Sequence, residues 1–294
     1  MHRRYSGGHG GGRSHLDPAN EFKNLRPGSY RAEDLVRILT DNAAIPLKKK
    51  LPKTSAEWVI RCHTMEAIPT DTKFLDTYAK RWLAVFGHGY YFDALEKDGD
   101  EETFKGIEVI DPKHPVLLDP STGKYMTHRG FFHPLDRKIY VVNGDFGRED
   151  KMLKILGTIL HEALHAFLNT FVCDKKCCED FLASTQGLGL EGHATQWSNA
   201  MFELEKAVKR DLGLKINTGF HNSIGAEMMQ GFNPEDDDLD RWRVPDKIIN
   251  FARERKTQGE REYRRMAIER RRATREMVAG RYSIELAYQW KFGH

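Results

Sequence analysis

Apolar residues recur every three or four positions from Lys151 to Phe171, which is the spacing of an amphipathic helix. Leu153, Leu156, Leu160 and Leu164 fall on one side of such a helix. The range 151–171 is therefore the clearest helix that the sequence predicts.

Weaker patterns of the same kind predict further helices. One spans 194–212, where Trp197, Met201 and Leu204 form an apolar stripe that we interpret as core packed against the 151–171 helix. Two more are expected before the centre of the chain, near 35–39 and 74–86. Short β-rich pieces lie between them, bounded by Asp-Pro, His-Pro and Thr-Gly pairs, and the predicted strands are 107–110, 116–118 and 138–142. Strands followed by two packed helices predict an α+β domain with a small sheet.

The two ends of the chain differ from this middle part. Residues 1–28 are rich in Gly, Ser, Asn and Pro and have almost no apolar periodicity, so we expect a disordered tail. The folded domain is expected to span 30–215. Residues 216–294 are weakly hydrophobic and strongly charged, which predicts a charged, mostly helical extension.

The composition limits the class of protein, but the small net charge does not indicate a binding partner. The 294 residues are 39% hydrophobic, and the formal net charge is only +3. No apolar run approaches the roughly 18 residues that span a bilayer, and the amino terminus lacks the apolar stretch of a secretory signal. We therefore expect no membrane contact and a soluble intracellular protein, in the nucleus or the cytoplasm.

The four cysteines are too few and too bunched for a disulfide framework in a chain of this length. Cys173, Cys177 and Cys178 have a C-x₃-C-C spacing that could hold a second ion or form a redox-sensitive bridge. This spacing is not a standard zinc signature, and reduced loop or core cysteines are the favoured interpretation.

His161, Glu162 and His165 form an HExxH motif within the clearest helix. The i, i+4 spacing places both imidazoles on one face, one turn apart, so that they can share a zinc ion. Glu162 lies beside them and can take a proton from a zinc-activated water, because zinc lowers the pKa of that water. A catalytic zinc site needs a third protein ligand, and the spacing alone does not distinguish among His133, His193 and His221.

Two segments carry a more specific resemblance. LHEALHAFL and EGHATQWSNAMFELE, the latter with three residues between its histidine and its tryptophan, resemble the SprT-like (Spartan-related) family of zinc metallopeptidases. The resemblance covers about residues 70–215. It implies a zincin-like fold, a Zn²⁺ cofactor bound by His161, His165 and His193, and Glu162 as the general base. It also implies that the protein is an enzyme, a hydrolase that cleaves peptide bonds in a protein or peptide substrate.

Two alternatives stay open. The same resemblance allows a DNA-stimulated protease that acts on chromatin or on DNA–protein crosslinks. Its local support is the range 251–281, where eleven Lys or Arg residues stand against five Glu residues, so this stretch is the candidate for DNA contact. The interleaved glutamates lower the local positive field and favour a solvated helix over phosphate contact. The other alternative is a zinc-stabilised binding protein without catalysis, but Glu162 favours catalysis because it has no role in holding zinc.

Overall fold

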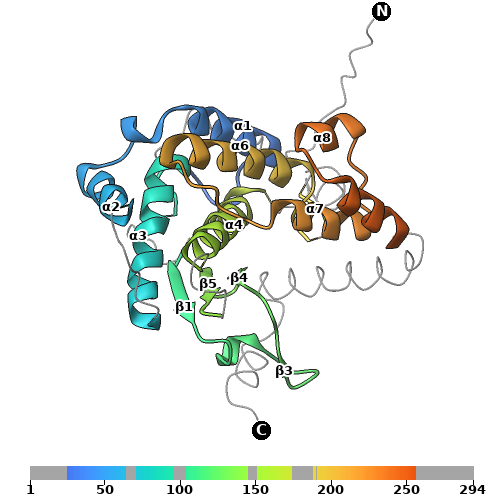
Figure 1. Cartoon of the computed structure of the whole chain (residues 1–294), viewed down its shortest axis with the longest axis horizontal. Helices are drawn as coiled ribbons and strands as arrows, with labels where there is room; N and C mark the ends of the chain where they lie inside the picture. The colour runs from blue at the N-terminus through green and yellow to red at the C-terminus, as the bar shows by residue number, and fades with distance from the viewer. Residues whose placement is uncertain are drawn as a thin grey trace, which may run out of the picture.

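A computed structural model of the chain describes residues 25–63, 71–95, 104–144, 151–173, 188–189 and 191–255. Within these ranges the protein combines a small sheet with packed helices, which confirms the expected α+β architecture (Figure 1). The first 24 residues of the predicted tail, Cys177, Cys178 and residues 256–281 of the basic stretch lie outside the described residues. Residues 25–28 belong to the folded part, because the Gly28 amide donates to the Thr170 carbonyl (2.9 Å) and Leu25 packs against the core.

The central element is helix α4 (Lys151–Phe171), which has the bounds that its apolar spacing predicts. Helix α6 (Thr195–Leu212) packs against α4 and ends at Gly213, whose left-handed φ of +66° terminates the helix. Helix α1 (Ala32–Ala44) packs against α6, so that α1 and α6 lie on one side of α4 and the sheet on the other (Figure 1). Trp197, Met201 and Leu204 are fully buried, which confirms their assignment to the core.

The three-stranded sheet has the order β1-β5-β4. Strands β1 (Ile107–Ile110) and β5 (Lys138–Val142) are parallel and were both predicted from their β-branched residues. Strand β4 (Gly130–His133) pairs antiparallel with β5 and was not predicted, because GFFH has no polar and apolar alternation. Helix α4 packs against β4 and β5.

The predicted strand at 116–118 is largely wrong. Residues Pro115–Leu117 form a single 3₁₀ turn, since Pro115 fixes its own φ and the His114 Nδ1 accepts from the Val116 amide (3.3 Å). Only β2 (Leu118–Asp119) follows, and it pairs with β3 (Lys124–Tyr125) in a separate two-stranded sheet. This hairpin projects away from α4 (Figure 1).

Gly130 lets β4 lie directly against α4. A Cβ atom at this position would come within 2.5 Å of the Thr158 Cγ2 and 2.7 Å of the Tyr140 carbonyl oxygen. Only glycine fits this close approach of a strand to a helix. The contact brings the backbone of β4 to the part of α4 that carries Glu162, whose Cγ would be 3.6 Å from the same Cβ.

The remaining helices surround this centre. Helix α3 (Thr72–Tyr90) covers β1 and begins at Asp71, whose side chain accepts from the Phe74 amide (2.9 Å). Helix α2 (Lys53–His63), which the sequence did not predict, packs on α3. No helix within the described ranges is long and apolar enough to cross a membrane.

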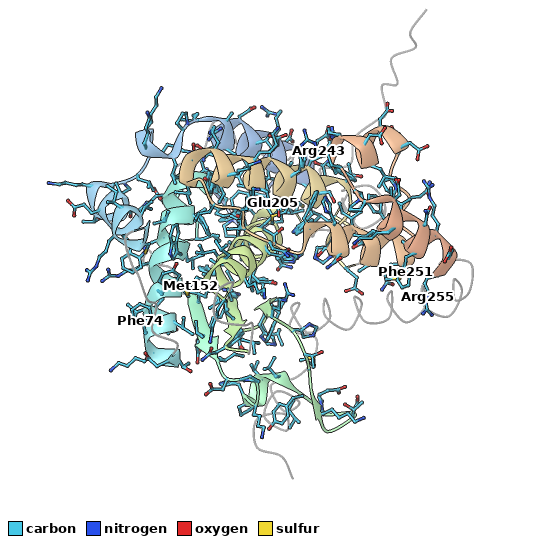
Figure 2. All side chains as sticks on the ribbon, in the orientation of Figure 1. Phe74, Met152, Glu205, Arg243, Phe251 and Arg255 are labelled. Atoms are coloured by element: carbon cyan, nitrogen blue, oxygen red, sulfur yellow. The ribbon has the colours of Figure 1, made fainter. Side chains whose placement is uncertain are left out.

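The described part of the predicted extension is helical and packs on the domain. Helix α7 (Phe220–Met229) contacts α6 and buries Phe220, Ile224 and Met228 in the main core. Helix α8 (Asp236–Arg241) begins with three aspartates, which is favourable at the positive end of a helix dipole. Residues 246–255 are again helical, and Phe251 and Arg255 lie on this last segment at the edge of the molecule (Figure 2).

Candidate metal centre

The HExxH motif lies in the middle of α4, with both histidines facing the same way. The Nε2 atoms of His161 and His165 are 3.1 Å apart, as expected for imidazoles one helical turn apart that point at a common position. Both side chains are partly buried. The helix alone therefore brings two ligand nitrogens together.

His193 supplies a third nitrogen from a different part of the chain. It stands just before Ala194, the residue that precedes α6, and its Nε2 lies 2.9 Å from that of His165 and 3.2 Å from that of His161. Among the described residues, these three histidines are the only group of three or more metal-binding side chains. The structure thus brings His193 to the pair, as the resemblance implied.

The other two candidates for the third ligand are engaged elsewhere. The His133 Nδ1 lies 3.1 Å from the Asp136 carboxylate at the end of β4. The Nε2 of His221 lies 3.1 Å from the Trp242 carbonyl oxygen. Neither ring belongs to the three-histidine group.

The geometry of the three nitrogens fits a metal ion. Ligand nitrogens about 2.0 to 2.1 Å from a tetrahedral ion lie about 3.4 Å from one another, close to the observed 2.9 to 3.2 Å. The His161 Nδ1 lies 2.9 Å from the Thr218 carbonyl, an acceptor that requires the proton on Nδ1 and leaves the Nε2 lone pair for a metal. A cation between the three Nε2 atoms would offset the repulsion between their lone pairs.

Burial sets the protonation states that such a site needs. It lowers the pKa of His161 to about 4, although the bond to the Thr218 carbonyl acts in the opposite direction. His161 is therefore neutral at pH 7 and can act as a ligand. Burial also raises the pKa of Glu162 to about 8, opposed by a hydrogen bond from the Phe132 amide. A positive ion beside Glu162 would favour its carboxylate form.

Glu162 lies between the histidines and the edge of the sheet. Its Oε2 accepts a hydrogen bond from the Phe132 amide of β4 (2.9 Å), and its Oε1 is 3.8 Å from the His161 Nε2. The Phe132 amide thus points away from β5 and toward the site. Sequence reasoning placed Glu162 correctly beside the histidines but did not find the strand that orients it.

Trp197 forms one wall of the site. Its ring centroid lies 4.6 Å from that of His193, 4.9 Å from that of His161 and 5.5 Å from that of His165. The side chain is fully buried. A single residue of α6 therefore packs against all three imidazoles and restricts their rotation.

The loop between α6 and α7 contacts the His161 ring at Nδ1, on the side away from the other two histidines. Its Thr218 accepts from the His161 ring through the main-chain carbonyl and donates its hydroxyl hydrogen to Glu205 of α6. Figure 2 shows Glu205 on α6 near the centre of the molecule. A Cβ at Gly157 would lie 2.2 Å from the Asn217 carbonyl oxygen, so glycine lets this loop cross α4 in close contact. These contacts join residues far apart in sequence, and periodicity could not have found them.

Gly157→Ala is expected to destabilise the protein by about 1 to 3 kcal/mol, because the new methyl group meets backbone that cannot rotate away. The same substitution in an unobstructed helix stabilises by up to about 1 kcal/mol, so the sign of the change is diagnostic. Thermal and urea denaturation measure it. Gly89→Ala is the matched control: its Cβ would meet only the movable end of Leu47, and we expect a smaller loss. A stabilised Gly157→Ala protein would contradict the close crossing of the loop.

The described cysteines form no disulfide. Cys173 is buried just after α4, where its amide donates to the Tyr30 carbonyl (2.8 Å), and Cys62 is half-buried on α2. Burial raises the pKa of the Cys62 thiol to about 11, which makes it unreactive at neutral pH. Cys177 and Cys178, the other members of the C-x₃-C-C cluster, lie outside the described residues.

No family model, curated protein or solved structure matches the chain. Its function is therefore inferred from the geometry of the three histidines and Glu162, together with the resemblance of the two sequence segments that contain them.

Proposed function

We propose that the protein is a zinc-dependent metallopeptidase with a zincin-like, SprT-like domain. The observation that carries this proposal is the convergence of the His161, His165 and His193 Nε2 atoms beside the Glu162 carboxylate. Three neutral nitrogen ligands with one open position are typical of catalytic zinc. Imidazole ligands also suit zinc better than magnesium or calcium, which prefer oxygen.

In the proposed reaction, zinc and the protein side chains have different roles. When bound, zinc acts as a Lewis acid that polarises a carbonyl and lowers the pKa of water. Glu162 is placed to accept a proton from a water molecule as the oxygen of that water attacks the peptide carbon. The same carboxyl group can return the proton to the departing amine nitrogen, which leaves Glu162 unchanged after each cycle. The Phe132 amide holds the carboxylate in position through its bond to Oε2.

Strand β4 offers a place for the substrate backbone. It pairs with β5 along one edge, and its other edge faces the site at Phe132. An extended peptide that pairs with this edge would bring a peptide bond near Glu162. This arrangement supports a protein or peptide substrate rather than a small molecule.

Removal of the metal tests the proposed activity. We expect the zinc-loaded protein to cleave casein or histone, to lose cleavage after treatment with 1,10-phenanthroline, and to regain it when zinc is restored. The measurement is gel electrophoresis of the substrate over time, with a serine-protease inhibitor as a control. Cleavage that survives complete removal of metal would contradict the proposal.

A DNA-stimulated form of this activity is the second candidate, and the basic excess of residues 251–281 favours it. If this stretch neutralises about four to six phosphates, log affinity for duplex DNA falls with log salt at a slope of roughly −3.6 to −5.4. Deletion of residues 251–294 should flatten that slope, as measured by gel-shift titration at several salt concentrations. Equal slopes for the full-length and the truncated protein would place DNA binding elsewhere. A nuclear location would accompany this form.

A further inference from the structure

Glu227 of α7 is a completely buried acidic residue that faces the loop carrying His193. Its Oε2 accepts hydrogen bonds from the main-chain amides of Glu191 (2.9 Å) and His193 (3.0 Å). The same oxygen lies 3.9 Å from the His193 Nδ1. One side-chain oxygen thus fixes two peptide groups of the loop, one of them belonging to a candidate ligand.

The described residues around His193, 188–189 and 191–194, form no helix or strand that could hold it. Gly189 and Gly192 have φ values of +79° and +89°, conformations that glycine adopts readily and other residues rarely. A Cβ at Gly189 would lie 2.3 Å from the Glu227 Oε1, so the loop backbone closes tightly around the carboxylate. The amide of Ala194 then bonds to the Leu188 carbonyl (3.0 Å), which completes the turn into α6. Glu227 is the side chain around which this turn is built.

The two candidate ligands on α4 and the one in the loop are held in place by different contacts. His161 and His165 are fixed by α4, whereas His193 must be held by contacts from outside its own loop. Packing on Trp197 restricts the His193 ring, but the main chain at this residue is bonded to Glu227. A buried carboxyl group in the middle of α7 would be costly unless it were hydrogen-bonded, and its Oε2 accepts from the amides of Glu191 and His193, both in the His193 loop.

We propose that Glu227 is a positioning residue of the metal centre, which holds His193 within ligand distance of His161 and His165. The inference rests on the proposed zinc function. It makes α7 a structural part of the site, although α7 lies in the segment predicted as an extension. Its consequence is that zinc affinity should depend on Glu227 even though Glu227 lies outside the three-histidine group.

The test is the dissociation constant for zinc of the full-length protein, measured by competition with a chromophoric chelator. We expect Glu227→Ala to weaken zinc binding about 10- to 100-fold, the range for loss of a residue that orients a ligand. Glu227→Gln keeps the shape and one acceptor oxygen but replaces charge-assisted bonds with weaker ones, so a loss of about threefold to tenfold is expected. Glu235→Gln is the matched control, because it makes the same change at an exposed residue before α8 whose side chain makes no capping hydrogen bond.

The melting temperature of the metal-free proteins separates positioning from general stability. A purely structural residue would lower this temperature without changing the zinc affinity of the folded protein. Unchanged affinity in both Glu227 variants would overturn the inference. If Glu227→Ala does not fold, Glu227→Gln decides: a weakened affinity supports the inference and an unchanged one overturns it.

The wild-type protein and His193→Ala complete the set. If wild type binds zinc, His193→Ala loses it and the Glu227 variants match wild type, then only the inference about Glu227 fails. If wild type and His193→Ala bind zinc equally or not at all, the proposed zinc site fails and the inference fails with it.

Discussion

Glu162→Gln is expected to lower kcat/KM for peptide hydrolysis by about 100- to 10,000-fold while the fold and the bound zinc are retained. The amide preserves the size and shape of the side chain and can still accept from the Phe132 amide. It cannot accept a proton from water at neutral pH. The three imidazoles proposed to hold the ion are not altered, so the expected loss is in catalysis rather than in metal binding.

The measurement is the rate of casein or histone cleavage by wild-type and variant protein with equal zinc content. Glu235→Gln serves as the control, since it makes the same change at an exposed position outside the site and should leave the rate unaltered. Cleavage by Glu162→Gln at the wild-type rate would remove Glu162 from the mechanism. Loss of zinc in this variant would show instead that Glu162 has a structural role.

His193→Ala is expected to reduce zinc content from one ion per chain to a small fraction, and activity with it. Removal of one of three nitrogen ligands leaves the two α4 histidines, which hold zinc far more weakly in the absence of the third. Elemental analysis of dialysed protein measures the change. His221→Ala is the matched control, because this histidine contacts Trp242 and lies outside the group. Undiminished zinc in His193→Ala would mean that the third ligand lies elsewhere.

Local pattern predicts the elements that are regular. The leucine spacing of α4 gives its bounds, and the apolar stripe of α6 predicts its start to within one residue. The β-branched segments 107–110 and 138–142 form β1 and β5. Each of these elements buries one face, so its apolar residues recur with the period of a helix or a strand. The sequence pattern therefore predicts them.

Elements fixed by distant contacts could not be predicted in this way. Strand β4 depends on Gly130, which allows close packing on α4. The local sequence pattern does not predict this strand. In the sequence, Glu227 is one of many acidic residues in a charged segment. In the structure it is buried, and its side chain accepts hydrogen bonds from amides 34 and 36 positions earlier in the chain. The Thr218 carbonyl supports His161 from 57 positions away. In the sequence, only the family resemblance selected His193 as the third ligand. The structure gives the physical reason, because the fold brings His193 beside His161 and His165.

The most direct test of the three-histidine zinc centre is zinc K-edge X-ray absorption of the purified protein and of His193→Ala. We expect wild-type zinc to have a first coordination sphere of three nitrogens and one oxygen, with zinc–nitrogen distances of about 2.0 to 2.1 Å, and one nitrogen fewer in whatever zinc the variant retains. Sulfur ligands in the wild-type spectrum, the same ligand set in both proteins, or a wild-type protein that takes up no zinc would contradict it.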